Sequence, residues 1–147
     1  MADSATPMPK ELARRLLAYE VASAKPAEAK DSTAFRVCEK LRRPLGKFLG
    51  VDGFRCLLAR ALALAGAEIP WMRALHIKAN GSLGGWDELK TKLDSRSVAE
   101  GELVLVEQLL GLLVIFIGGA LTSELLHDIW PRLMVEISEG GERYEEK

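Results

Sequence analysis

Few side chains in this sequence could carry out catalysis or hold a metal ion, since it contains two histidines and two cysteines. His76 and His127 have no second histidine or cysteine at metal-ligand spacing, whereas a zinc site requires three or four ligands. Asp128 follows His127 directly, but adjacent residues of a helix do not face each other. The sequence therefore predicts no metal site and no histidine-based catalytic site.

The two cysteines, Cys38 and Cys56, fall on the apolar stripes of predicted helices. A free cysteine in such a place acts as a small hydrophobic side chain, whereas a nucleophilic thiolate needs a polar, electropositive surrounding. We expect both thiols to lie in the core. The first residues, Met1 to Ser4, lack the basic and apolar regions of a signal peptide. This start favours a cytoplasmic location, in which thiols stay reduced.

Glycine-rich stretches do not provide a nucleotide site. Gly46–Lys47 and residues 81–85 lack the spacing and the strand-to-helix setting of a phosphate-binding loop. No serine lies in the pattern of a nucleophile elbow. We therefore expect no cofactor, no catalytic residue and no enzymatic activity.

Basic residues are concentrated in the first part of the chain. Residues 1–60 carry twelve Lys and Arg against seven Asp and Glu, whereas residues 61–147 carry eight against fourteen. Clustered Lys and Arg neutralise phosphates in nucleic-acid-binding proteins, but the whole chain is not basic and no aromatic residues interleave with these cations, as a single-strand binder would need. The candidate surface for a partner or a nucleic acid consists of Arg36, Lys40, Arg42, Arg43, Lys47, Arg55 and Arg60.

Glu107 and Gln108 interrupt a stretch that is otherwise apolar. In the interpretation that we favour, the first turns of their helix are half-buried and both side chains point to water. In the alternative, they make a buried polar contact that receives Arg60 or Arg43, because a buried carboxylate needs a cationic partner.

The segment that must organise the fold is 103–126, because residues 108–123 are sixteen in a row without a charge. A helix that is apolar on every side belongs in a core or in lipid. A membrane-spanning helix needs about 20 mostly apolar residues, and the uninterrupted run 109–121 has thirteen. We therefore predict a helix buried on all sides, with membrane association through 103–126 as a less favoured alternative.

Leucine and alanine dominate the apolar residues, which favours helix over strand. The predicted fold class is all-α: a compact bundle of about six helices around a buried central helix at about 98–118 that continues to about 130. Gly118–Gly119 should break or kink this helix, and we expect its glycines to allow close packing. Residues 76–85 should form either a short β-hairpin or an irregular loop, because Asn80–Gly81 favours a turn.

Local signals predict where several helices begin and end. Pro44 should stop or kink the helix that begins at Ser32 or Thr33. Residues 97–100 fit a capping box that would start the central helix near Val98. The predicted organisation is a disordered N-terminus at 1–7, one helical domain at 8–137 with a loose linker at 23–31, and a disordered acidic tail at 138–147.

No catalytic, metal or nucleotide pattern stands out in the sequence, and its apolar content is large for a chain of this size. Both observations favour a non-enzymatic protein–protein interaction module, an adaptor or regulatory subunit that binds another protein or itself. A nucleic-acid-binding accessory role through residues 36–60 is the first alternative, and membrane association is the second.

Overall fold

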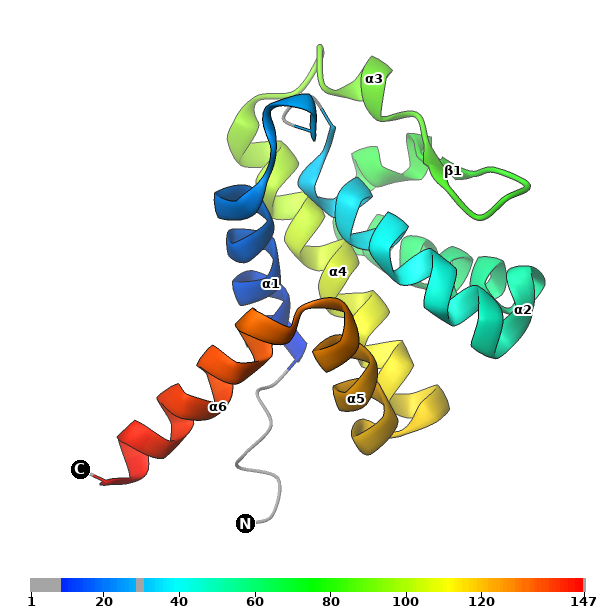
Figure 1. The fold of residues 1–147 in the computed structure, drawn as a ribbon. Coiled ribbons are helices and arrows are strands. Elements are labelled where there is room, and N and C mark those ends of the chain that lie inside the picture. Colours follow the sequence, from blue (N-terminus) through cyan, green and yellow to red (C-terminus); the bar gives the residue numbers. More distant parts are fainter. Residues whose placement is uncertain (1–8, 29–30, 147) are drawn as a thin grey trace.

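The computed structural model describes residues 9–28 and 31–146, with side chains as far as Ser138. It confirms the predicted all-α class, with helices packed together and a two-stranded hairpin (Figure 1). The helices and strands, in chain order, are α1 (Pro9–Ser23), η2 (Pro26–Glu28), α2 (Thr33–Glu68), η3 (Pro70–Ala74), β1 (His76–Ile77), β2 (Leu83–Gly84), α3 (Trp86–Leu89), α4 (Ser95–Ile117), α5 (Gly119–Ile129) and α6 (Pro131–Glu146).

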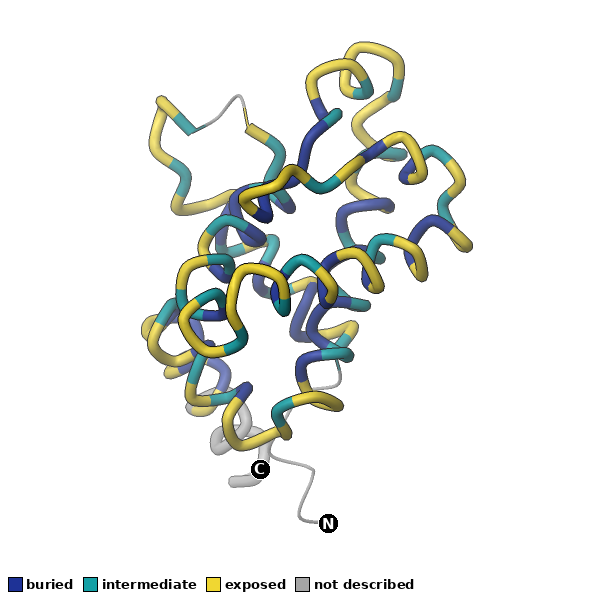
Figure 2. The backbone as a smooth tube through the Cα atoms, turned by 90° about the vertical axis from the view of Figure 1, so that its right-hand side faces the viewer, coloured by how far each residue is buried: buried dark blue, intermediate teal, exposed yellow. Residues whose placement is uncertain are grey.

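Helix α4 is the centre of the bundle, as the sequence predicted. It packs against both α1 and α2, and Figure 1 shows it running between them. Its inward positions follow helical spacing, and each fully buried leucine contributes about 1.5–3 kcal/mol relative to an exposed one. In Figure 2, buried and exposed positions alternate along the helices. The buried apolar residues of α4 are Leu105, Val106, Leu109, Leu110 and Leu113.

The last turn of α4 is not buried, which corrects the prediction of burial on all sides. Ile115 is 76% exposed, Phe116 is 65% exposed, and Val114 is also exposed. Every face of this turn is apolar, and its neighbours are too few to cover all of its faces. The central helix is therefore a core element over most of its length and an apolar surface at its C-terminal end.

The break between α4 and α5 lies at Gly118, where the sequence predicted it. Gly118 has φ 87° and ψ 158°, a conformation that is available essentially to glycine alone. The expectation of close packing at Gly111, Gly118 and Gly119 is wrong, because a Cβ added at any of them would meet nothing within 4 Å. The close approach is instead at Gly101, where a Cβ would collide with the ring of Trp71.

Helix α2 consists of two arms that meet at Gly50, which has φ 82° and ψ 160°. In Figure 1 the first arm runs outward from the bundle and the second returns beside it. The predicted stop or kink at Pro44 is wrong, because helix continues through Pro44 and the reversal lies six residues later at Gly50. The proline removes one backbone donor, and the first arm tolerates that loss.

The hairpin alternative at 76–85 is the correct one. Strands β1 and β2 pair antiparallel, with His76 opposite Gly84 and Ile77 opposite Leu83.

The start of α4 differs from the predicted capping box near Val98. Asp94 is the cap, and its side chain accepts a 2.8 Å hydrogen bond from the backbone N–H of Ser97.

The described part of the tail that we predicted to be disordered lies in α6, which runs to Glu146. Pro131 suits the first position of this helix, where its missing N–H would have no partner. Glutamate and arginine are good helix formers, which accounts for the continuation. Figure 1 shows α6 extending away from the other helices. The predicted disorder at 1–7 lies outside the described residues.

Candidate functional site

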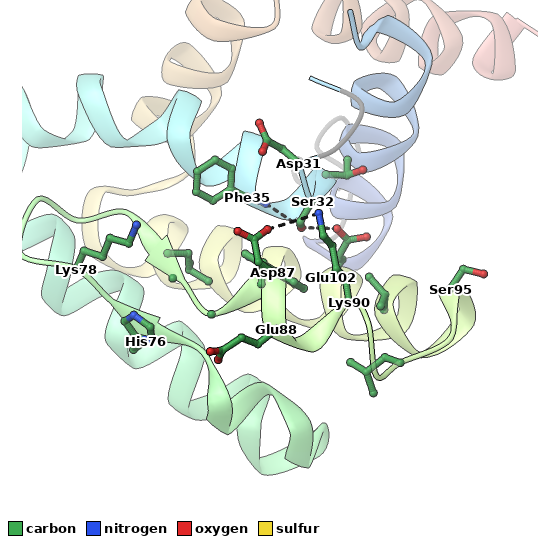
Figure 3. A pocket seen from close by; sticks show the side chains of 17 residues that line it. Asp31, Ser32, Phe35, His76, Lys78, Asp87, Glu88, Lys90, Ser95 and Glu102 are labelled. Atoms are coloured by element: carbon green, nitrogen blue, oxygen red, sulfur yellow. Dashed lines mark hydrogen bonds and ion pairs between the residues drawn. The ribbon is translucent and has the colours of Figure 1, made fainter. Parts of the chain in front are cut away.

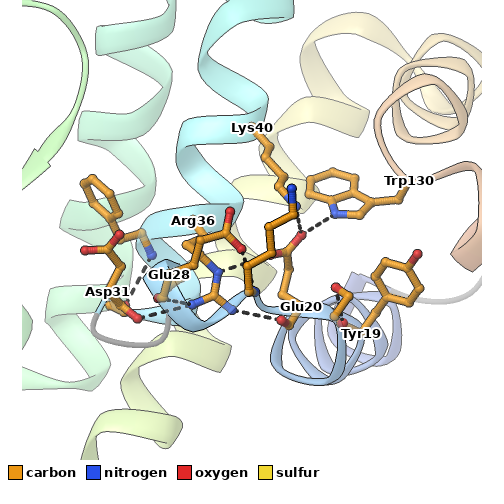
Figure 4. Close-up of polar contacts among 12 residues, drawn as sticks. Tyr19, Glu20, Glu28, Asp31, Arg36, Lys40 and Trp130 are labelled. Atoms are coloured by element: carbon orange, nitrogen blue, oxygen red, sulfur yellow. Dashed lines mark hydrogen bonds and ion pairs between the residues drawn. The ribbon is translucent and has the colours of Figure 1, made fainter.

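Arg36, the first residue of the predicted basic surface, lies inside the protein. It is 6% exposed, and its Nε donates a 3.3 Å hydrogen bond to Glu20 Oε1 (Figure 4). Its two terminal nitrogens donate to the backbone carbonyls of Glu20 at 2.9 Å, and of Glu28 and Asp31 at 3.2 Å each. Arg36 is therefore not a surface residue. Its guanidinium ties down the described parts of segment 23–31, which the sequence predicted to be a loose linker.

Glu20 receives two further donors from distant parts of the chain. Lys40 Nζ lies 2.5 Å from Glu20 Oε2, and the indole Nε1 of Trp130 donates to the same oxygen at 2.7 Å. Burial alone would raise the pKa of Glu20, but the hydrogen bonds from Lys40, Trp130 and Arg36 outweigh it and hold this pKa below its ordinary value. With these three hydrogen bonds, the Glu20 carboxylate fixes α1 and α2 to the start of α6.

Two more members of the basic set are paired with carboxylates. Arg42 donates to Glu39 Oε1 at 2.9 Å, and the hydroxyl of Ser82 donates to Glu39 Oε2 at 2.7 Å. This pair joins α2 to the hairpin. Arg55 lies 3.6 Å from Asp52. The described residues give no ion-pair partner to the remaining three members, which are exposed: Arg43, Lys47 and Arg60.

The basic set therefore does not form one continuous cationic face. One of its cations is buried and three others are compensated by acids. Non-specific nucleic-acid binding needs several uncompensated cations facing the phosphates. This geometry weakens the nucleic-acid hypothesis.

Glu107 and Gln108 are both half-buried, which agrees with the interpretation that we favoured. Gln108 Nε2 donates a 3.4 Å hydrogen bond to Glu68. Neither Glu107 nor Gln108 pairs with Arg43 or Arg60 among the described residues. Among the residues whose burial the structure describes, the buried carboxylates are instead Glu20 and Glu102, neither of which was predicted from the sequence.

The histidines and cysteines do not come together. His76 is exposed and its ring lies over Gly84 on the opposite strand, and His127 is exposed on α5. Cys38 is buried as predicted, and burial raises the pKa of its thiol to about 12. Cys56 is exposed, which corrects the prediction, because it lies on the side of the second arm opposite the buried Phe54, Leu57 and Leu58. The described residues include no cluster of ligands that could hold a metal ion.

A pocket of about 730 Å³ lies between the start of α2, the hairpin, α3 and the start of α4 (Figure 3). Within it, the Ser32 hydroxyl donates to Glu102 Oε2 at 2.6 Å and accepts from the Phe35 N–H at 3.2 Å. The Ala34 N–H donates to the same Glu102 oxygen at 3.0 Å. Ser32 is therefore the cap of α2, and the Glu102 carboxylate stabilises the positive end of that helix.

The Ser32–Glu102 pair is not arranged for nucleophilic catalysis. A serine nucleophile needs a base that is free to accept its proton in the reaction. Here the carboxylate oxygen already accepts two hydrogen bonds, and the hydroxyl oxygen is used by the helix cap. The charged residues around the pocket mouth include acids and bases, with Asp87 and Lys90 paired at 3.5 Å. The arrangement supports a structural role.

A second hollow is an apolar groove of about 180 Å³ between the first arm of α2 and α5. Phe48 stands 58% exposed on one side of it, and Leu121 is exposed on the other. Ile117 extends the lining to the exposed last turn of α4. We call this surface the apolar end. It consists of the groove residues Pro44, Leu45, Phe48, Ile117, Leu121 and Leu125 and of the exposed Val114, Ile115 and Phe116.

Two carboxylates belong to the groove. Glu124 and Asp128 of α5 are part of its lining, and we call them the acidic rim. Arg43 and Lys47 are neighbours in sequence of the lining residues Pro44 and Phe48, but they are not part of the lining. All four are exposed, and none has an ion-pair partner within the described residues.

Comparison of the chain with known protein families, with curated proteins and with solved structures finds no match. None of the described helices is both long and apolar enough to cross a membrane. The site must therefore be interpreted from its own geometry.

The sequence contained one signal for the apolar end that the predicted burial set aside. The run 109–121 is apolar on every face, and in a small bundle the last turn of even a central helix has too few neighbours to cover all of its faces. The acidic rim gave no such signal, because α5 and the first arm of α2 are about 80 residues apart in the sequence and come together only through the fold.

Proposed function

We propose that this protein is a non-enzymatic protein–protein interaction module that binds its partner through the apolar end. The observation that supports this proposal is the exposure of Ile115 at 76% and Phe116 at 65%, beside a groove that is also apolar. Side chains of this size belong in a core, and covering each one contributes about 1.5–3 kcal/mol. Contiguous exposed apolar patches mark interaction sites on proteins of this kind.

The rest of the molecule is suited to presenting such a surface. Phe116 lies near the end of α4, and this continuous helix packs against both α1 and α2. The Glu20 network fixes α1 and α2 to the start of α6. A rigid scaffold lowers the entropy lost when a surface binds its partner.

A photo-reactive amino acid at position 116 of the full chain, expressed in the cells from which the protein comes, tests this function. We expect covalent adducts with protein at Phe116. The matched control is position 92, where Lys92 is exposed just before the opposite end of α4, more than about 30 Å away along the helix axis. Absence of protein adducts at 116 above this control would overturn the proposal, and adducts with lipid alone would favour the membrane alternative in its place.

A further inference from the structure

The side of α5 that lines the groove carries both apolar and acidic residues. Its lining residues are Leu121, Glu124, Leu125 and Asp128. Their spacing of three, one and three residues places them on one face of the helix, because residues three and four apart are neighbours on a helix surface. One strip of surface therefore offers two leucines for apolar contact and two carboxylates for ionic contact.

The two carboxylates of the acidic rim are not compensated within the described part of the chain. Both are exposed, and neither forms an ion pair with a described residue. Glu20 and Glu39, by contrast, have cationic partners. Like charges four residues apart on a helix are mildly destabilising. A partner that places cations against the acidic rim removes this repulsion.

The nearest cations in the sequence of α2 do not change the charge of the groove. The first arm of α2 lines the groove with Pro44, Leu45 and Phe48. A helix turns by about 100° per residue, so Arg43 and Lys47 lie more than about 100° around the arm from the middle of this face. The charge that a bound partner meets inside the groove is therefore negative.

We infer that the groove binds an amphipathic helix of another protein that carries lysine or arginine beside its apolar side chains. The inference rests on the proposed function and names the chemical class of its partner. Helices that bind in apolar grooves place their anchors at i, i+3, i+4 and i+7, which is also the spacing of the lining face of α5. Two cations four residues apart on such a helix match the spacing of Glu124 and Asp128.

The apolar part of the surface stabilises this contact. The groove has a volume of about 180 Å³, and an apolar cavity of about 150 Å³ is large enough for a benzene ring. The groove therefore has room for one large apolar anchor. A stable interface buries about 800 Å² on each partner, so the bound helix must also cover Ile115 and Phe116, which are exposed beside the groove.

Other occupants match a negatively charged groove less well. The acidic rim repels an anionic lipid surface and the phosphates of a nucleic acid. Helix α6 extends away from the other helices (Figure 1) and could reach a second copy of the chain, but it contains more acidic than basic residues. It would meet the acidic rim with like charge, which is unfavourable across an interface.

A designed pair of peptides tests the charge preference of the groove. The basic probe is a synthetic helical peptide of about 18 residues, about 27 Å long, with leucine along one face and lysine on both sides of the leucines. The acidic probe has glutamate in place of every lysine. Fluorescence anisotropy of each labelled peptide measures its binding to the purified full-length chain. We expect the basic probe to bind at least about 10-fold more tightly, with a preference that decreases as salt is added.

Reversing the charge of the acidic rim should reverse this preference. With Glu124→Lys and Asp128→Lys, we expect the acidic probe to bind more tightly than the basic one. The matched control is Glu88→Lys with Glu100→Lys, which changes the net charge equally at exposed positions of α3 and α4 and should keep the original preference. Phe48→Ser, at a side chain that is 58% exposed, should weaken the binding of both probes because it removes apolar contact.

Equal binding of the two probes, or a preference that the reversed rim leaves unchanged, would refute the basic helix as the partner. A second copy or an anionic vesicle that occupies the apolar end, detected by sedimentation and released by Phe116→Ser, would refute it as well. The cross-linking experiment separates this failure from failure of the proposed function. Adducts of residue 116 with a protein segment that lacks lysine and arginine would sustain the interaction module and overturn the inferred partner. Circular dichroism of each variant confirms that the substitutions leave the helices intact.

Discussion

The indole Nε1 of Trp130 donates a 2.7 Å hydrogen bond to the buried carboxylate of Glu20, 110 residues earlier in the chain. The same carboxyl group accepts from Lys40 and Arg36 on α2. A buried carboxylate costs several kcal/mol to desolvate unless such donors surround it. This one group therefore connects the first helix, the second helix and the junction between α5 and α6.

Replacing Glu20 with alanine should destabilise the protein strongly. The change leaves Arg36 buried without its carboxylate, and removing one partner of a buried pair costs about 3–5 kcal/mol. We expect a loss of this size in the free energy of unfolding measured with urea. The control is Glu11→Ala on the same helix, which breaks an exposed pair with Arg14 and should change the free energy by less than about 1 kcal/mol. Similar losses for both variants would refute the structural role of Glu20.

Acid should weaken the fold through the same carboxylate and through Glu39. Burial tends to raise both pKa values, but donors from Lys40, Trp130 and Arg36 to Glu20, and from Arg42 and Ser82 to Glu39, hold them below the ordinary value of 4.5. Between the folded pKa values and the ordinary value of 4.5, the unfolded chain therefore binds more protons than the folded chain. Their contribution is therefore complete above about pH 4.5 and is lost as the pH falls through the folded pKa values.

This dependence is measured by urea unfolding at a series of pH values from neutral to well below 4.5, the ordinary carboxyl pKa. The Glu20→Gln variant starts less stable and should lose less free energy over the acidic range, because a carboxyl group whose pKa the fold lowers is gone. An equally steep loss in the variant would show that Glu20 does not carry the effect.

The fold could be predicted from the sequence where one physical effect dominated. The charge-free run 108–123 indicated a central helix, and Gly118–Gly119 indicated its break. Both signals are local, because the length of an apolar run and the backbone conformations open to glycine can be judged from neighbouring residues alone. Arg36 shows the limit of this approach. In sequence it is one cation among several, and its burial depends on Glu20 and on two backbone carbonyls that the fold brings to it.

The candidate site was predictable only in part for the same reason. An apolar content too large for the chain to bury could be recognised from composition, and it favoured an interaction surface. Which turn remains uncovered depends on where neighbouring helices end, and the exposure of Phe116 could not be inferred from its own apolar neighbours. Cys56 was misplaced because its position in the second arm is opposite the buried side, which is formed by Phe54, Leu57, Leu58, Ala61 and Ala65.

The two thiols should differ in reactivity. Cys56 is exposed, whereas Cys38 is buried and burial raises its pKa to about 12. Because the thiolate is the reactive form, we expect Cys38 to react at least about 100-fold more slowly with a disulfide reagent at mildly alkaline pH. Cys56→Ser should abolish the fast reaction, Cys38→Ser should retain it, and denaturant should make both thiols of the unmodified chain react quickly. Two fast thiols in the folded protein would disagree with the burial of Cys38.

Two neighbouring glycines should respond in opposite ways to the same substitution. Gly118 has φ 87° and ψ 158°, so an alanine there is strained by about 1–3 kcal/mol although its Cβ would meet nothing within 4 Å. Gly119 is the first residue of α5 and is equally open, so its alanine variant should be neutral or more stable by about 0.4–1 kcal/mol. Thermal unfolding of the two variants measures the difference directly. If Gly118→Ala matched Gly119→Ala, the positive φ would not be required, and α4 could continue into α5 without the break that leaves the apolar end exposed.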